Sequence, residues 1–165
     1  MDLWDFVDWV EVNPVLGYDA ETTGLNWWDR DRDFRCRPAQ FGNATESWVL
    51  PVEIDPEFAE AAAWALRTAH RVIAHNANFD AHVAEVTLGV TLEELAPRLL
   101  CTKISAHLVD PRAVKEQGPG LKLEELTKHY ISADLATGVK RSTTRIAQRY
   151  SSDDSSWVRN GSGRR

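Results

Sequence analysis

The apolar residues of this chain fall into short runs in its first third and into longer helical stretches beyond it. The run from Val15 to Glu21 predicts a first strand, which the turn residues 22–24 close. Residues 26–37 are polar and charged, which is typical of a surface loop. Two β-like runs, 38–43 and 47–52, are separated by a turn-prone segment and predict a hairpin. Three strands are therefore expected before the first helix.

Helix signals begin at Asp55, which is suited to the N-cap position and is followed by Pro56 at the first helical position. We expect this helix to continue to about residue 70. The run 71–74 then predicts a short buried strand, and 78–88 predicts a helix with Gly89 at its C-terminal cap.

The same local signals continue downstream, where Thr91 and Glu94 form a capping-box pair. A further strand is expected at 99–101, and helices are expected at 103–109 and 121–130. Strands followed by alternating helices and strands predict a mixed β-sheet flanked by α-helices, which is an α/β fold.

The chain has 165 residues, enough for one domain with a sizeable core but not for two. Residues 1–135 contain 12 Lys and Arg against 23 Asp and Glu, a balance of −11. Residues 136–165 contain 7 against 2, a balance of +5, with few apolar residues and little periodicity. We therefore expect a folded domain over 1–135 and a polar, basic, disordered tail over 136–165.

The composition, 43% apolar and 27% charged, is that of a globular protein. The first residues are acidic rather than basic, and no apolar run is long enough for a membrane span, so neither a signal peptide nor a membrane partner is expected. Cys36 and Cys101 are too few for a disulfide framework, which favours a cytoplasmic location. The net charge of −6 argues weakly against a basic nucleic-acid surface, although bound metal ions can supply positive charge.

Three carboxylates carry the candidate chemistry. Asp19 and Glu21 are two residues apart in the first strand, so both side chains point to the same face. Asp80 is expected near the start of a helix. Carboxylates are ligands of hard divalent ions, and two such ions can drive phosphodiester hydrolysis. Each residue alone also has an ordinary explanation, a solvated strand end or a first-turn acid favoured by the helix dipole.

Taken together, the segments around these acids resemble motifs of the DEDD superfamily of 3′→5′ exonucleases. Residues 19–25, Asp-Ala-Glu-Thr-Thr-Gly-Leu, resemble the first motif, and residues 75–80, His-Asn-Ala-Asn-Phe-Asp, resemble the second. Residues 101–111 and 120–130 resemble the segments that follow in proofreading domains of bacteriophage-type DNA polymerase I. The resemblance runs from about Val15 to Ile131.

The resemblance implies a ribonuclease-H-like fold, two Mg²⁺ or Mn²⁺ ions, and removal of nucleotides from the 3′ end of single-stranded DNA. It implies that Asp19 bridges the two ions, that Glu21 binds the ion on the nucleophile side, and that Asp80 holds the other ion. A polymerase domain or subunit is the implied partner. An RNA-trimming exonuclease of the same superfamily remains an alternative.

The resemblance also implies substrate-binding residues. Asn76 matches a position that contacts the substrate strand, and Thr22 and Leu25 match positions near the terminal nucleotide. For Leu25, packing in the core remains an alternative. Trp27 and Trp28 follow the first motif, and they either stack on bases or anchor their loop on the domain.

The family pattern needs a fourth carboxylate on a late helix, with a Tyr four residues before it or a His five residues before it. Tyr150 and Asp154 fit this spacing, but the residues around them lack the apolar positions that would dock such a helix. The alternative is that the chain stops or diverges before the third motif. It would then be a catalytically deficient domain that binds DNA ends or a polymerase partner.

Overall fold

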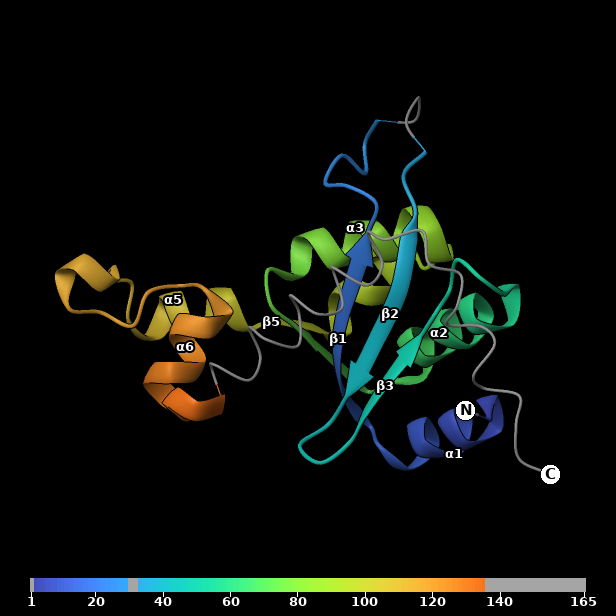
Figure 1. Cartoon of the computed structure of the whole chain (residues 1–165), viewed down its shortest axis with the longest axis horizontal. Helices are drawn as coiled ribbons and strands as arrows, with labels where there is room; N and C mark the ends of the chain where they lie inside the picture. Colours follow the sequence, from blue (N-terminus) through green and yellow to red (C-terminus); the bar gives the residue numbers. More distant parts are fainter. Residues whose placement is uncertain (1, 30–32, 136–165) are drawn as a thin grey trace. The chain divides into compact units, whose positions relative to one another are not determined.

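The computed structural model of the chain describes residues 2–29 and 33–135 (Figure 1). Its described residues divide into two compact units, residues 2–105 and 106–135. No helix in the described ranges is long and apolar enough to cross a membrane. The predicted boundary after residue 135 stays a prediction, because residues 136–165 lie outside the described part.

A five-stranded sheet with the order β3-β2-β1-β4-β5 forms the centre of the unit 2–105 (Figure 1). Its strands are β1 (Val15–Thr22), β2 (Cys36–Gly42), β3 (Ser47–Leu50), β4 (Arg71–Ala74) and β5 (Leu99–Cys101). β1 pairs with β2 in antiparallel and with β4 in parallel orientation, so β1 is the central strand of a mixed sheet. All five predicted strands are present. β2 begins and β3 ends two residues earlier than predicted.

The mixed sheet and the helices of the chain confirm the expected α/β class. The helices are α1 (Leu3–Val12), α2 (Pro56–Thr68), α3 (Ala77–Leu88), α4 (Leu92–Leu95), α5 (Thr102–Val109) and α6 (Leu123–Tyr130), with 3₁₀ turns η1 (Ala96–Arg98) and η2 (Val114–Glu116).

The predicted helix ends are confirmed by their hydrogen bonds and backbone angles. The Asp55 carboxylate accepts a hydrogen bond from the Glu57 N–H at 2.9 Å, and Pro56 opens α2. Gly89 ends α3 with φ of 67°, a left-handed conformation that glycine adopts without strain. Thr91 and Glu94 exchange the two hydrogen bonds of a capping box.

Helix α1 was not predicted from the sequence. The Asp2 side chain caps it by accepting a hydrogen bond from the Trp4 N–H. Phe6, Trp9 and Val10 follow at helical spacing and are buried, and the Phe6 ring lies 5.7 Å from the Trp48 ring of β3. The spacing of these three apolar residues is the sequence signal for the helix, although acidic residues are interspersed among them.

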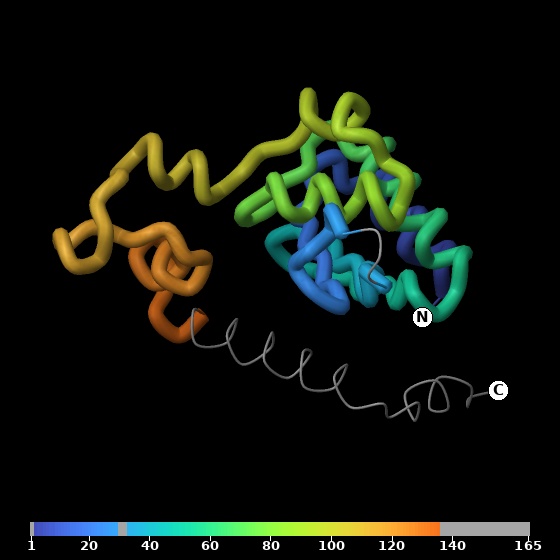
Figure 2. The backbone as a smooth tube through the Cα atoms, turned by 90° about the horizontal axis from the view of Figure 1, so that it is seen from above, coloured from blue at the N-terminus to red at the C-terminus, as the bar shows by residue number. Residues whose placement is uncertain are grey.

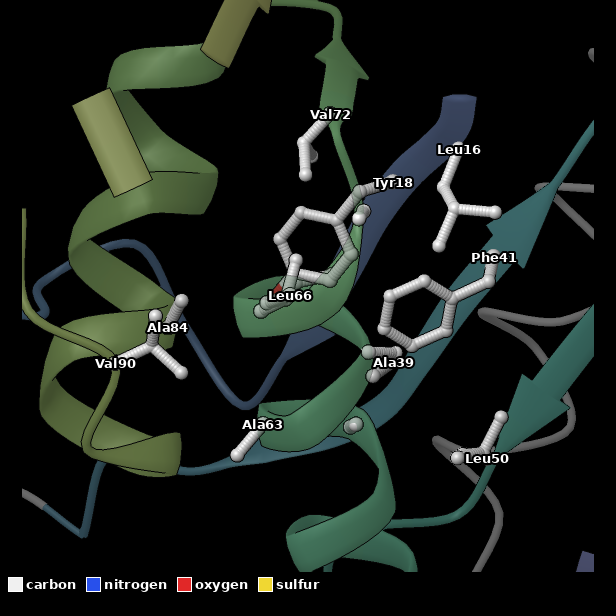
Figure 3. Packing of buried hydrophobic residues seen from close by; sticks show 14 of the residues in the cluster. Leu16, Tyr18, Ala39, Phe41, Leu50, Ala63, Leu66, Val72, Ala84 and Val90 are labelled. Atoms are coloured by element: carbon white, nitrogen blue, oxygen red, sulfur yellow. The ribbon is translucent and has the colours of Figure 1, made fainter. Parts of the chain in front are cut away.

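The core lies between the sheet and the helices α2 and α3, and it also fixes which way β1 presents its side chains. Leu16, Tyr18 and Ala20 are buried, and Figure 3 shows Leu16 and Tyr18 among residues of the neighbouring strands and of α2. Because side chains alternate along a strand, the residues between them, including Asp19 and Glu21, point to the opposite face.

In the segment 106–135, a local network shapes the connection to α6. The Arg112 guanidinium donates two hydrogen bonds to the Asp110 carboxylate, and these bonds hold the pKa of Asp110 at about 2. Gly120 has φ of 72° and precedes α6, in which Leu126 and Thr127 are buried. The helix predicted over 121–130 is thus present, beginning two residues later.

Candidate active site

Asp19 and Glu21 lie at the carboxyl end of the central strand, on the face away from the Leu16 and Tyr18 side chains. Asp19 is exposed and Glu21 is half-buried. On the neighbouring strand, Gln40 pairs in register with Asp19, and its Nε2 donates a hydrogen bond to Asp19 Oδ2 at 3.4 Å. The two acids therefore lie side by side, as their spacing predicts.

Asp80 reaches the same strand from helix α3. β1 and β4 pair only as far as Gly17 and Ile73, so the Ala20 N–H beyond that point is left without a strand partner on the β4 side. The Asp80 carboxylate takes that place and accepts a hydrogen bond from the Ala20 N–H at 3.1 Å. Asp80 is only 3% exposed. Its carboxylate is thus fixed next to the backbone between Asp19 and Glu21.

The three carboxylates interact electrostatically. Burial is the largest cause that raises the pKa of Asp80, and the charge of Asp19 adds to it, so that this pKa reaches about 7 despite the hydrogen bond from Ala20. Although Asp19 is exposed, the protein around it removes part of the solvent from its carboxylate, and this desolvation raises its pKa. Desolvation also raises the pKa of Glu21, and the charge of Asp19 adds to that effect. The site therefore concentrates negative charge without enough nearby positive charge to balance it.

Carboxylate oxygens are the donors that hard divalent cations take in proteins. Three hard oxygen donors with raised pKa values repel one another, and a bound cation would relieve that repulsion. Within residues 2–29 and 33–135, no group of three or more Asp, Glu, His or Cys side chains is placed to hold a metal ion by itself. Mg²⁺ is usually bound through one or two carboxylates, with water and substrate phosphate supplying the other ligands.

The residues expected to bind substrate lie on two loops beside these acids. Thr22 is half-buried, and its hydroxyl donates a hydrogen bond to the Gly24 carbonyl, which shapes the turn after β1. Leu25 is 73% exposed, so it is not packed in the core. Asn76 is exposed and has φ of 63° at the turn between β4 and α3. Their contacts with substrate stay predictions.

His75 and Thr102 form a hydrogen bond with each other, and His75 is close enough to Asp19 to affect its pKa. His75 Nδ1 and Thr102 Oγ1 share a hydrogen bond of 2.9 Å, and the proximity of His75 partly offsets the raised pKa of Asp19. Sequence reasoning assigned no role to Thr102 or to Gln40. Both contacts depend on strand pairing, which local sequence does not specify.

The two tryptophans after the first motif lie in different surroundings. The Trp27 ring stacks on the His82 ring of α3, with centroids 3.8 Å apart and an interplanar angle of 10°, so Trp27 anchors its loop. Figure 2 shows the backbone of the loop that follows β1 next to the backbone of α3. Trp28 meets the Trp27 ring edge-on and is 62% exposed. The anchoring interpretation therefore applies to Trp27, whereas Trp28 remains accessible to other molecules. Tyr150 and Asp154 lie outside the described residues.

Comparisons with known proteins agree on one family. A family model described as 3′-5′ exonuclease matches residues 2–156. A DNA polymerase of Mycobacterium phage L5 is 40% identical over 147 residues, which cover 88% of this chain and 24% of the polymerase. A DNA polymerase of Mycobacterium phage D29 is 39% identical over 151 residues, 90% of this chain and 24% of that protein. The chain spans about a quarter of the length of these curated relatives.

Among solved structures, the EXO domain of Nibbler from Aedes aegypti is similar to this chain, with a TM-score of 0.47 and 9% identity. The match covers 66% of this chain and 52% of the Nibbler chain.

Proposed function

Because the chain belongs to the 3′-5′ exonuclease family whose model spans residues 2–156, we propose that it removes nucleotides from the 3′ end of single-stranded DNA in a metal-dependent reaction. The supporting observation is that Asp80, from α3, is held against β1 between Asp19 and Glu21, and that burial, together with the charges of these acids, raises its pKa. A site with this much uncompensated negative charge is suited to divalent cations rather than to direct contact with DNA.

Asp19, Glu21 and Asp80 would hold two Mg²⁺ or Mn²⁺ ions, with Asp19 shared between them. When bound, such ions supply an activated water and offset the charge of the scissile phosphate. Gln40 orients the Asp19 carboxylate through its hydrogen bond, and His75 lies close enough to influence its charge.

The remaining residues position the substrate strand. Leu25 is exposed on the loop after β1, where its side chain can contact the base of the terminal nucleotide. Asn76 is exposed on the turn after β4, where its amide can contact the sugar-phosphate backbone.

The similarity to phage DNA polymerases supports a proofreading role, in which the chain trims mismatched 3′ ends for a polymerase domain or subunit. Cytoplasm is the proposed location, because Cys36 and Cys101 are both free thiols.

The test uses the full chain, Mn²⁺ and single-stranded DNA labelled at its 5′ end. A ladder of progressively shorter labelled products is expected, and it should disappear in the Asp19→Ala variant. Glu60→Ala, which removes an exposed acid on α2, is the matched control and should retain the ladder. Thermal unfolding of each variant verifies that it is folded.

Two results would change the assignment. Faster shortening of RNA than of DNA of the same sequence would favour the RNA-trimming alternative. Tight binding to DNA without shortening, even with the protein in excess, would identify a catalytically deficient domain.

A further inference from the structure

The carboxyl ends of two parallel strands meet beside the proposed active site. β4 and β5 pair in parallel register up to Ala74 and Cys101. The chain leaves β4 through His75 and Asn76 into α3, and it leaves β5 directly into α5. The first residues of the two helices therefore lie next to each other, and each helix start carries a partial positive charge.

A lysine from α5 contacts an asparagine from the turn before α3. Lys103 Nζ donates a hydrogen bond to Asn76 Oδ1 at 3.2 Å. Asn76 occupies the N-cap position of α3, yet its side chain does not cap that helix. Because Lys103 engages the amide oxygen, the Asn76 NH₂ group is at the opposite end of the side-chain amide and remains a donor for another partner.

The charge of Lys103 is not neutralised within the described part of the chain. The ion pairs there involve other residues, namely Asp33 with Arg35, Glu53 with Arg37, Arg67 with Glu94, His82 with Glu85, and Asp110 with Arg112. Lys103 therefore keeps its positive charge in a region, residues 1–135, whose charge balance is −11.

Backbone donors gather at the same place. Burial raises the pKa of the Cys101 thiol, but hydrogen bonds from the backbone N–H groups of Ile104, Ala77, Lys103 and Asn76 outweigh it, so the pKa lies below its usual value. The two helix starts thus create a positive local potential next to Lys103.

We propose that Lys103 and Asn76 form a phosphate-binding pair that holds the backbone of the substrate strand at the carboxyl ends of β4 and β5. This inference rests on the proposed nuclease function and deepens it. The Lys103 ammonium supplies a point charge to the phosphate oxygens, and the Asn76 amide supplies neutral N–H donors. Such contacts position the strand without reading its sequence.

The test measures how salt weakens binding of a fluorescent single-stranded oligonucleotide to the full chain. Ca²⁺ is present, and gel analysis verifies that the strand stays intact. Lys103→Gln should weaken binding roughly tenfold, because a charge-assisted hydrogen bond is lost. It should also reduce the slope of log K against log salt by about 0.7, the value for one phosphate contact on a single strand.

Two variants serve as controls. Lys103→Arg should retain the wild-type slope, because it keeps the charge. Arg71→Gln removes one positive charge at the other end of β4 and should leave the slope unchanged. Glycine tolerates the φ of 63° at position 76, so Asn76→Gly should leave the turn intact. In a protein that carries Asn76→Gly, Lys103→Gln should weaken DNA binding less than it does in the wild type, because the side chain that pairs with Lys103 is absent.

A wild-type slope in Lys103→Gln, or an equal loss in Arg71→Gln, would overturn the phosphate-binding pair. The nuclease assay separates this result from a failure of the proposed function. If the wild type shortens DNA but Lys103→Gln has the wild-type salt slope, only the phosphate-binding pair is wrong. If Lys103→Gln has the reduced salt slope but the wild type does not shorten DNA, the pair stands as a DNA-binding feature and the nuclease proposal is wrong.

Discussion

Asp80 illustrates how a single residue can be costly to the fold and useful to the site. Its carboxyl group is 3% exposed, it satisfies the Ala20 N–H, and it lies near two other acids. An ionised carboxylate in such surroundings destabilises the folded state unless a cation accompanies it. The rise of its pKa to about 7 reflects the free energy needed to ionise the carboxyl group in these surroundings.

The stability of the protein in EDTA should therefore fall as the pH rises. Asp80 titrates near pH 3.9 in the unfolded chain and at about 7 when folded, so between these values the folded state binds more protons. Its stabilising contribution is complete below about pH 4 and is lost as the pH rises through 7. Urea unfolding of the wild type should show a loss on the order of 4 kcal/mol from this residue.

Asp80→Asn should lack this pH dependence. The amide oxygen can still accept the Ala20 N–H, but the side chain carries no charge, so the variant should be the more stable protein above pH 7 in EDTA. Adding Mn²⁺ should stabilise the wild type more than the variant. Parallel pH profiles for the two proteins would show that Asp80 is not the titrating group.

Residue types and spacings that depend only on neighbours in sequence could be predicted. The two-residue spacing of Asp19 and Glu21 requires a shared strand face, and the structure shows it. By contrast, the hydrogen bond between Ala20 and Asp80 joins residues 60 positions apart. No local pattern encodes such a contact, because it depends on where β1 and β4 separate.

At the level of whole elements, helix α1 contributes a cluster of aromatic rings to the core. Phe6 is fully buried, and its ring contacts those of Trp9, Phe41 and Trp48 at centroid distances of 6.1, 5.4 and 5.7 Å. These contacts join the helix to β2 and β3. The packing of α1 is therefore part of the folded unit rather than a peripheral addition.

Phe6→Ala should destabilise the protein by about 3–5 kcal/mol, because it leaves a cavity among these rings. Trp4→Ala on the same helix should change stability by less than about 0.5 kcal/mol, since Trp4 is 74% exposed. Urea unfolding of both variants measures the difference. Equal effects would mean that α1 does not pack against the sheet in solution.

Elements whose ends carry local chemistry were predicted with small errors. Asp55 with Pro56, the Thr91 and Glu94 pair, and Gly89 each satisfy the backbone groups at a helix end, so their positions identify those ends directly. The strand order could not be predicted in the same way. Parallel pairing of β4 with β5 joins segments 25 or more residues apart, and several registers satisfy the same apolar pattern.

At the scale of the whole molecule, the two regions of the chain carry opposite net charge and would therefore interact differently with DNA. Residues 1–135 have a balance of −11, whereas residues 136–165 have a balance of +5. The net negative charge of the first region opposes the binding of a nucleic acid, and the proposed cations and Lys103 would offset it locally. The second would attract any nucleic acid without regard to its 3′ end.

If the acidic site governs binding, the affinity of the full chain for single-stranded DNA should depend on divalent ions. At equal ionic strength, replacing Ca²⁺ with EDTA should weaken binding by roughly tenfold or more, because carboxylates and phosphates then repel each other. Fluorescence anisotropy with a labelled oligonucleotide provides the measurement. Asp19→Ala should bind equally with and without Ca²⁺, since it removes the acid shared by the proposed ions. If instead the wild-type affinity is the same in EDTA, the basic segment 136–165 holds the DNA, and the acidic site acts only after that binding.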